Sequence, residues 1–333
     1  MEVMFTLFTI LHPLVDACSV TVLVVGGMSW QRVLMYNALA FALQFPLGVA
    51  LDARPRLAKG ALVASLALTL AGVGLCACGG ALGTTRPTEW AALASACVGN
   101  ALFHLSAGKT VLDEHEGKGG PIGLFISTGA LGLFAGMRLA GGYGLWCCLG
   151  FGAALAAVGA TAVWRWRGRA EYPPSRRRVA KRCSGRGALP SRDAQPCLPF
   201  SVSRPHLSFG LILAALFALV AWRSWAGLLA GGMTNAAGLG FALAGAAVTW
   251  AGKAAGGYLG DRIGRWIVTA VSVVGSLSLC FLCRPEQAAL WLALLFVAQL
   301  ATGPVLSLMY DKSGKASGTA FGLNCLGLFT GSL

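Results

Sequence analysis

The stretch that decides the fold is Gly256-Gly257-Tyr258-Leu259-Gly260-Asp261-Arg262-Ile263-Gly264-Arg265, which follows a long apolar run. Glycines spaced in this way let two membrane helices approach each other closely. Asp261 can cap the N-terminus of a neighbouring helix, and Arg262 and Arg265 can pair with acidic side chains. The stretch therefore predicts a tight polar turn between two packed helices.

The residues on both sides of this turn are strongly apolar. Of the 333 residues, 56% are hydrophobic and 11% are charged, whereas a soluble domain carries about 25% charged residues. This composition excludes an ordinary soluble enzyme. The apolar runs reach the roughly 20 residues that a helix needs to cross a bilayer, and they lack the alternation of barrel strands. We therefore predict an all-α polytopic membrane protein.

The predicted spans fall into two sets around a basic segment. The first set lies at roughly Val3 to Gly27, Val33 to Leu51, Leu57 to Leu82, Trp90 to Thr110, Pro121 to Gly141 and Tyr143 to Trp164. The second lies at roughly Leu207 to Gly231, Asn235 to Gly257, Trp266 to Cys283 and Gln287 to Met309, with a last span from Ser317. We predict an N-terminal six-helix bundle (1–164), a linker (165–206) and a C-terminal bundle (207–333). The C-terminal bundle is expected to be truncated, with about 11 helices in all.

A degenerate copy of the polar turn follows the second span, as Gly48-Val49-Ala50-Leu51-Asp52-Ala53-Arg54. The two copies resemble the GxLaDRxGRR loop of the major facilitator superfamily, which occurs between its second and third helices and between its eighth and ninth. The resemblance implies two six-helix bundles and transport by alternating access. It also implies that the two turns act as gating loops, through Gly257, Gly260, Asp261, Arg262, Gly264, Arg265, Gly48, Asp52 and Arg54.

Three shorter stretches are similar to the fosmidomycin-resistance-type exporters of this superfamily. They are His12-Pro13-Leu14-Val15-Asp16, Asn100-Ala101-Leu102-Phe103-His104 and Arg223-Ser224-Trp225. This similarity implies proton-coupled export of a small amphiphilic or anionic compound. One departure concerns the Gly-Pro that antiporters of the superfamily usually carry late in the fifth helix. Here Gly129, Gly132 and Gly136 keep the glycine spacing but Met137 replaces the proline, which weakens the assignment of antiport.

His12 and Asp16 are the first candidates for chemistry inside the membrane. A charged side chain at the bilayer centre costs about 2.5 to 3.5 kcal/mol on insertion scales, so each one is a functional candidate. The two residues are four apart and share a helix face, where an imidazole and a carboxyl can share a proton. Burial favours the protonated carboxyl and a nearby cation favours the carboxylate. We predict that Asp16 and His12 couple transport to protons; a purely structural hydrogen-bonded pair is the alternative.

Four further polar residues are candidates for substrate binding. Arg223 lies midway along the seventh span, and its guanidinium suits either an anionic ligand or the counter-charge of Asp16. Asn100 and His104 share one helical stripe, although His104 also fits a hydrogen-bonded core histidine. Arg138 lies closer to the outer end of its helix, from which it can snorkel to the interface.

The basic residues sort by loop. Of the 26 Lys and Arg, 21 fall in alternate connections, and 11 of these lie between Arg165 and Arg204. The positive-inside rule then places the N-terminus and the linker in the cytoplasm, for a protein of the cell inner (plasma) membrane. The net charge of +14 is concentrated in this linker, so we expect it to contact membrane lipid and not nucleic acid. We expect a monomer.

The sequence indicates neither a cofactor nor a metal centre. Cys280 and Cys283 have CxxC spacing but lack the second pair that a zinc site needs, and the acidic residues at 113–116 fit a solvated turn. HExxH, GxSxG and Walker motifs are absent, which argues against an enzyme. The predicted function is a secondary active transporter for proton-coupled export. An organic-anion uptake permease and a non-transporting membrane remnant are the alternatives.

Overall fold

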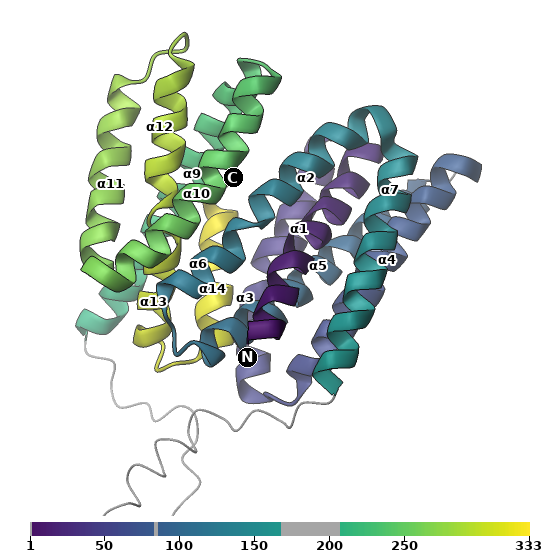
Figure 1. The fold of residues 1–333 in the computed structure, drawn as a ribbon, viewed down its shortest axis with the longest axis horizontal. Coiled ribbons are helices and arrows are strands. Elements are labelled where there is room, and N and C mark those ends of the chain that lie inside the picture. The colour runs from purple at the N-terminus through teal and green to yellow at the C-terminus, as the bar shows by residue number, and fades with distance from the viewer. Residues whose placement is uncertain (1, 83–85, 168–206) are drawn as a thin grey trace, which may run out of the picture.

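The computed structural model describes residues 2–82, 86–167 and 207–333. These residues form helices joined by short turns, without a strand among them (Figure 1). Helices are expected here because an apolar segment in lipid must satisfy its backbone hydrogen bonds internally. The all-α fold predicted from the sequence is confirmed.

The first bundle, here called the N-terminal bundle, holds the helices before the linker. They are α1 (Glu2–Val25), α2 (Trp30–Asn37), the π-helix η1 (Ala38–Ala42), α3 (Gln44–Ala53), α4 (Leu57–Leu82), α5 (Arg86–Glu114), α6 (Gly119–Ser127) and α7 (Gly129–Arg167). The C-terminal bundle holds α9 (Leu207–Ala236), α10 (Leu239–Ile263), α11 (Arg265–Leu282), α12 (Ala288–Gln299), α13 (Thr302–Lys312) and α14 (Ser317–Gly331).

Helix α7 is a hairpin of two membrane passes. Its backbone leaves helical geometry at Tyr143 (φ −132°, ψ 34°), directly after Gly141 and Gly142, and Figure 1 shows the chain turning back at this end of the molecule. Glycines weaken a helix interior because they lose the most backbone freedom on folding. The sequence had placed the boundary between the fifth and sixth spans here.

Eight segments in the described residues are long and apolar enough to cross a membrane. One of them, 119–167, contains the α6–α7 pass and the second pass of α7. The helices α10 and α14 run beside these segments as further passes (Figure 1). Counted in this way, the described residues make about eleven passes, six in the N-terminal bundle and five in the C-terminal bundle, which agrees roughly with the predicted number.

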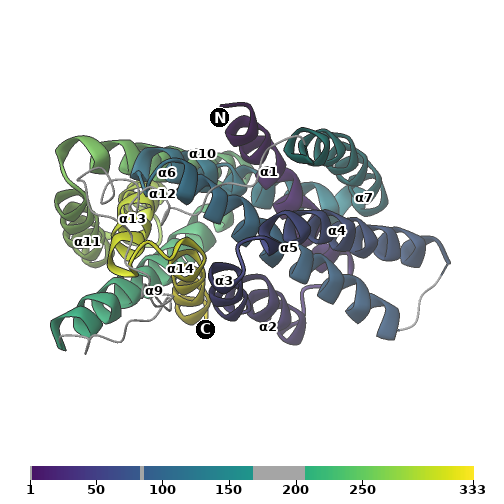
Figure 2. The same ribbon diagram turned by 90° about the horizontal axis from the view of Figure 1, so that it is seen from below.

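The two bundles lie side by side and meet along two helix pairs, α3 with α14 and α6 with α10 (Figure 2). Glycines make both contacts. A Cβ added at Gly48 would overlap the carbonyl group of Gly318, and one added at Gly257 would overlap that of Gly119. Each polar turn of the sequence thus supplies a glycine that brings its helix into backbone contact with the other bundle.

Most basic connections lie at one end of the molecule. The turns after α3, α5, α10 and α13 are at this end, which we call the linker end because α7 finishes and α9 begins there (Figure 1). Several of the basic residues counted as loop residues lie at helix ends, and two of them lie more than one turn inside a helix. Lys109 lies within α5 and Lys253 within α10, so their assignment to connections is wrong.

Candidate functional site

A buried polar cluster lies where α1 meets α5 and α6. It consists of His12 and Asp16 of α1 with Asn100 and His104 of α5, and their exposed fractions are 2%, 5%, 1% and 8%. Asn100 Nδ2 donates to Asp16 Oδ1 at 2.8 Å. His12 Nε2 lies 3.2 Å from Asp16 Oδ2, and His104 Nε2 lies 3.6 Å from Asp16 Oδ1. The i to i+4 spacing on both helices, noted in the sequence, thus brings His12, Asn100 and His104 around the carboxylate of Asp16.

The backbone partners of the two histidines indicate which ring nitrogens donate. His12 Nδ1 lies 2.6 Å from the carbonyl oxygen of Phe125, and His104 Nδ1 lies 2.9 Å from that of Asn100. A carbonyl oxygen only accepts, so each Nδ1 must carry a hydrogen. The two Nε2 atoms are then the acceptor sides of their rings, yet they lie 2.7 Å apart.

Two nitrogen lone pairs at this distance repel each other unless a cation lies between them. A Zn²⁺ ion held by two imidazoles at its usual bond lengths sets their nitrogens about 3.3 Å apart, so 2.7 Å is the length of a hydrogen bond. One shared proton between His12 and His104 satisfies this geometry. With Asp16 ionised, a cluster that binds this proton would have no net charge.

A break between two helices supplies part of the cluster. Helix α6 ends at Ser127 and α7 begins at Gly129. The carbonyl of Phe125, near this end, accepts from the Thr128 hydroxyl and from His12 Nδ1, as helix-terminal carbonyls can accept from side chains. The Phe125 ring also stacks on His12, with centroids 4.7 Å apart. A Cβ at Gly129 would overlap Asp16 Oδ2, which makes glycine necessary there.

The glycine series in the fifth pass packs against α1, as its spacing suggested. A Cβ added at Gly132 would overlap the backbone of Pro13, and one at Gly136 would meet the backbone of Ala17. Met137, which takes the place of the proline, is exposed. Close contact between α1 and α7 therefore needs only the glycines.

Arg223 of α9 is buried in the C-terminal bundle, with 5% of its surface exposed. Its Nη1 donates to Gln299 Oε1 and to Thr302 Oγ1, both at 3.0 Å. These acceptors flank the break between α12 and α13. Nε and Nη2 are buried and have no hydrogen-bond partner in the described residues. Asp16 bonds within its own bundle, so the structure does not bring it into contact with Arg223.

Lys253 is a candidate that the sequence analysis missed. It lies in the middle of α10, four residues before Gly257, and makes no hydrogen bond or ion pair in the described part of the chain. It interacts electrostatically with Arg223 and Asp16 and with His104. The signal was present in the sequence, since the predicted eighth span already contained this lysine.

Arg138 occupies a different place from the other candidates. It is an exposed residue of α7, five positions before Tyr143, and its Nη2 donates to Asn235 Oδ1 on α9 at 2.7 Å. This bond joins the two bundles at the end opposite the linker. The guanidinium is therefore held by a neighbouring helix instead of lying apart from the protein.

The aspartates of the two polar turns cap helices of the opposite bundle. Asp261 accepts from the backbone N–H groups of Gly119 (2.9 Å) and Gly120 (2.7 Å), at the start of α6. Asp52 accepts from those of Gly318 (3.0 Å) and Thr319 (2.7 Å), at the start of α14. Neither helix has a side-chain cap from its own N-cap residue. The capping role expected of Asp261 is confirmed, and Asp52 repeats it.

Ion pairs reinforce this end of the interface. Lys109 of α5 donates to Asp52 Oδ1 at 2.7 Å and to Ser317 Oγ at 2.8 Å, and its Nζ lies 3.3 Å from Asp113. Within the C-terminal bundle, Arg265 donates to Asp311 at 2.6 Å. Of the remaining gating-loop residues, Gly260 packs on Pro304, Gly264 has a positive φ of 112°, and Arg54 and Arg262 are exposed.

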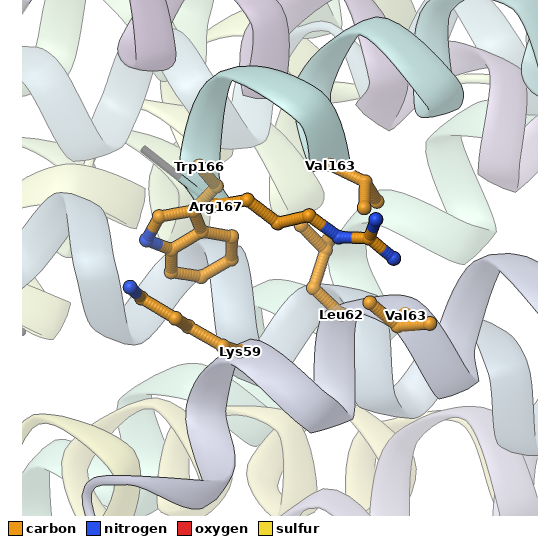
Figure 3. Close-up of a pocket in the computed structure, with 6 residues that line it drawn as sticks. All are labelled: Lys59, Leu62, Val63, Val163, Trp166 and Arg167. Atoms are coloured by element: carbon orange, nitrogen blue, oxygen red, sulfur yellow. The ribbon is translucent and has the colours of Figure 1, made fainter. Parts of the chain in front are cut away.

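A small pocket of about 40 Å³ lies away from these groups. Figure 3 shows Trp166 and Arg167 of α7 facing Lys59, Leu62 and Val63 of α4. Both helix segments are on the side of the N-terminal bundle that faces away from the C-terminal bundle (Figure 2). The pocket is therefore separate from the buried polar groups at the bundle interface.

The chain matches no protein-family model, and no curated protein matches it. Solved structures do match. FucP, a major facilitator superfamily transporter in its outward conformation, aligns with a TM-score of 0.70 at 13% identity, over 98% of this chain and 89% of that one. The N162A variant of this fucose:proton symporter from E. coli gives 0.65 at 12%, over the same shares.

A bacterial homologue of the iron transporter ferroportin in its outward-facing state also aligns. Its TM-score is 0.53 at 15% identity, over 99% of this chain and 89% of that one. At such identities the likeness concerns the fold. Together with the eleven passes and the reciprocal contacts of the two bundles, these alignments show that the chain has the fold of the major facilitator superfamily transporters.

Proposed function

We propose that this protein is a secondary active transporter of the cell inner membrane that exports a small amphiphilic or anionic compound in exchange for protons. The single observation that carries the proposal is the 2.7 Å contact between His12 Nε2 and His104 Nε2 beside the buried carboxyl of Asp16. A titratable group buried in a membrane span is costly, and such groups mark proton pathways. The proposal draws further support from the fold, because one of its solved examples is a fucose:proton symporter.

Alternating access requires the two bundles to separate at one end and close at the other. The caps that Asp52 and Asp261 provide join the bundles at the linker end. Rocking the bundles apart there would break these charge-assisted bonds, so the caps are suited to stabilise one state of a two-state cycle. The bond from Arg138 to Asn235 occupies the corresponding place at the other end.

Movement of the bundles also affects the shared proton. Phe125, whose carbonyl holds His12, belongs to α6, and α6 packs against α10 of the other bundle. A shift of α6 would alter the Phe125–His12 bond and with it the stability of the His12–His104 proton. This is how a conformational change can bind or release a proton without a direct contact between proton and substrate.

Vesicle transport tests the proposal. Purified protein is reconstituted into liposomes that contain a pH-sensitive dye, and small anions, neutral amphiphiles and cations are added in turn. A compound that moves protons only when protein is present is a substrate. Entry with a rise of luminal pH indicates antiport, as export requires, and entry with a fall indicates symport, as the uptake permease requires.

Asp16→Asn should abolish gradient-driven flux of that compound and leave counterflow exchange measurable. The substitution keeps the volume of the side chain but removes the carboxylate that balances the shared proton. Glu286→Gln, at an exposed acid in the turn before α12, is the matched control. Unchanged gradient-driven flux in Asp16→Asn would remove Asp16 from coupling. Absence of both flux and counterflow for every compound would favour the non-transporting remnant.

A further inference from the structure

We propose that Arg223 and Lys253 together bind an oxyanion group, a carboxylate or a phosphate, of the transported compound. This inference rests on the proposed transport function and specifies its substrate class. It is carried by two buried or half-buried cations, Arg223 of α9 and Lys253 of α10, that form no ion pair with an acid among the described residues.

The first step is the geometry of Arg223. Its Nη1 is held by Gln299 and Thr302, which fixes the plane of the guanidinium. Nε and Nη2 form the other edge, and both are buried without an acceptor in the described residues. These two N–H groups point in parallel, the arrangement that binds the two oxygens of a carboxylate or phosphate at once.

The second step is the charge balance. The C-terminal bundle contains three acids, Asp261, Glu286 and Asp311, and the structure places all three at helix ends, away from mid-span. Asp16, across the interface, accepts from Asn100 and lies beside His12 and His104, all of its own bundle. Arg223 and Lys253 therefore give the middle of the interface a charge of +2.

The third step is the position of Lys253. The residue before it, Gly252, packs against Gln299, which holds Arg223; a Cβ there would lie 3.1 Å from Gln299 Cβ. The backbone of Lys253 itself faces Gly123 of α6, in the other bundle. Lys253 thus borders the N-terminal bundle through its backbone, and its charge interacts with both Arg223 and His104.

An unpaired cation inside a membrane protein is costly, and a protein that keeps two of them gains only if a ligand completes the site. An oxyanion placed between the Arg223 edge and the Lys253 ammonium would satisfy the free donors and neutralise much of the charge. Such a ligand would also touch both bundles, because Lys253 borders α6, and this is where a substrate must bind in order to be exposed alternately.

The test measures binding and not transport. Benzoate and phenylphosphonate serve as oxyanion probes, and benzamide serves as the neutral isostere. The thermal unfolding midpoint of the purified protein in detergent is recorded at increasing probe concentration. A saturable rise with benzoate, with phenylphosphonate or with both, and none with benzamide, is expected, because a ligand that binds only the folded state stabilises it. Comparison of the two probes separates carboxylate from phosphate recognition.

Two variants identify the site. Arg223→Lys keeps the charge but lacks the two-donor edge, and it should weaken probe binding tenfold or more. Lys253→Met should also weaken binding tenfold or more, and should raise the unfolding midpoint of the ligand-free protein because an unpaired cation has been removed. Arg284→Gln, at an exposed arginine of the opposite end, should leave probe binding unchanged.

The opposite results would overturn the inference. Probe binding that is unaffected by both Arg223→Lys and Lys253→Met would place any anion elsewhere. A lower ligand-free midpoint in Lys253→Met would make this lysine a structural residue. If the vesicles transport a compound but neither oxyanion binds, only this inference fails. If the oxyanions bind through Arg223 and Lys253 but no flux occurs, the proposed transport function fails instead.

Discussion

At the residue scale, the arrangement with the clearest chemical consequence is the contact between His12 Nε2 and His104 Nε2 at 2.7 Å. Each ring already donates from Nδ1 to a backbone carbonyl, so neither can provide the donor that this contact needs unless the pair binds an extra proton. A histidine pair of this kind is a switch with two charge states. The stability of the protonated His12–His104 pair depends on Asp16, whose carboxylate is close enough to balance the positive charge.

Gly129→Ala tests this arrangement with a single methyl group. The new Cβ would overlap Asp16 Oδ2 and come within 2.7 Å of His12 Nε2, so the cluster must shift. We expect a loss of stability of about 1 to 3 kcal/mol, typical of overpacking, and a loss of proton-coupled flux. Both are measured on the variant in detergent and in vesicles.

Gly150→Ala is the control, since this glycine lies in the second pass of α7 with open space around it. It should leave flux intact and change stability in the favourable direction by up to about 1 kcal/mol, because alanine is the better helix former. Proton-coupled flux that survives in Gly129→Ala would argue against a coupling role for the cluster.

At the scale of helices, the breaks and ends of helices position the candidate functional side chains. The break between α6 and α7 frees the carbonyl that holds His12, and the break between α12 and α13 presents the two acceptors that hold Arg223. These breaks occupy corresponding positions in the fifth and tenth passes, one in each bundle. Helix ends are useful in this way because their terminal backbone groups lack partners inside the helix.

The reciprocal caps give the second prediction. Asp261→Asn should destabilise the protein by about 1 kcal/mol, the usual cost of a weakened helix cap. Asp52→Asn should cost more, about 2 kcal/mol, because it also removes one of the two carboxylates that pair with the buried Lys109 and leaves only Asp113. Thermal or denaturant unfolding in detergent measures both values.

Two further variants separate the cap from the ion pair. Adding Lys109→Met to Asp52→Asn should recover part of the loss, since the buried lysine that has lost the nearer of its two carboxylates is then gone. Lys315→Gln, at an exposed residue in the turn before α14, should change stability by less than about 0.5 kcal/mol. Equal losses in Asp52→Asn and Asp261→Asn would contradict the proposed difference between the two turns.

At the scale of the whole molecule, charge decides orientation. The linker end holds the basic turns that follow α3, α5, α10 and α13, whereas Arg86 and Arg284 lie in connections at the other end. Assigning Lys109 and Lys253 to helices lowers the number of basic loop residues. The linker end still holds more of them than the opposite end, so the positive-inside rule still predicts a cytoplasmic linker end.

Cysteine labelling tests the orientation. In a variant without native cysteines, a cysteine at Arg262 or within residues 165–204 should react with an impermeant reagent only from the cytoplasmic side. A cysteine at Arg86 or Arg284 should react from outside. The reverse pattern would invert the predicted topology and, with it, the side on which the aspartate caps close.

The sequence determined the parts of this protein that depend on local pattern. Apolar run length gave the eleven passes, and the glycine-rich turns around Asp52 and Asp261 identified the repeated plan of two bundles. The i to i+4 spacing placed His12 with Asp16 and Asn100 with His104 on shared helix faces. These features follow from helix geometry and from the exclusion of polar backbone from lipid, which act within a single segment.

Only the tertiary structure decided which faces meet. The pairing of His12 with His104 joins residues 92 positions apart, and no pattern within one helix specifies such a contact. The sequence pattern assigned Lys109 and Lys253 to loops. Packing places Lys109 beside Asp52 and gives Lys253 no ion-pair partner among the described residues. The sequence allowed two roles for Arg223, an anion-binding group or the counter-charge of Asp16. Only packing could distinguish them, because the role of a guanidinium depends on the acceptors that surround it.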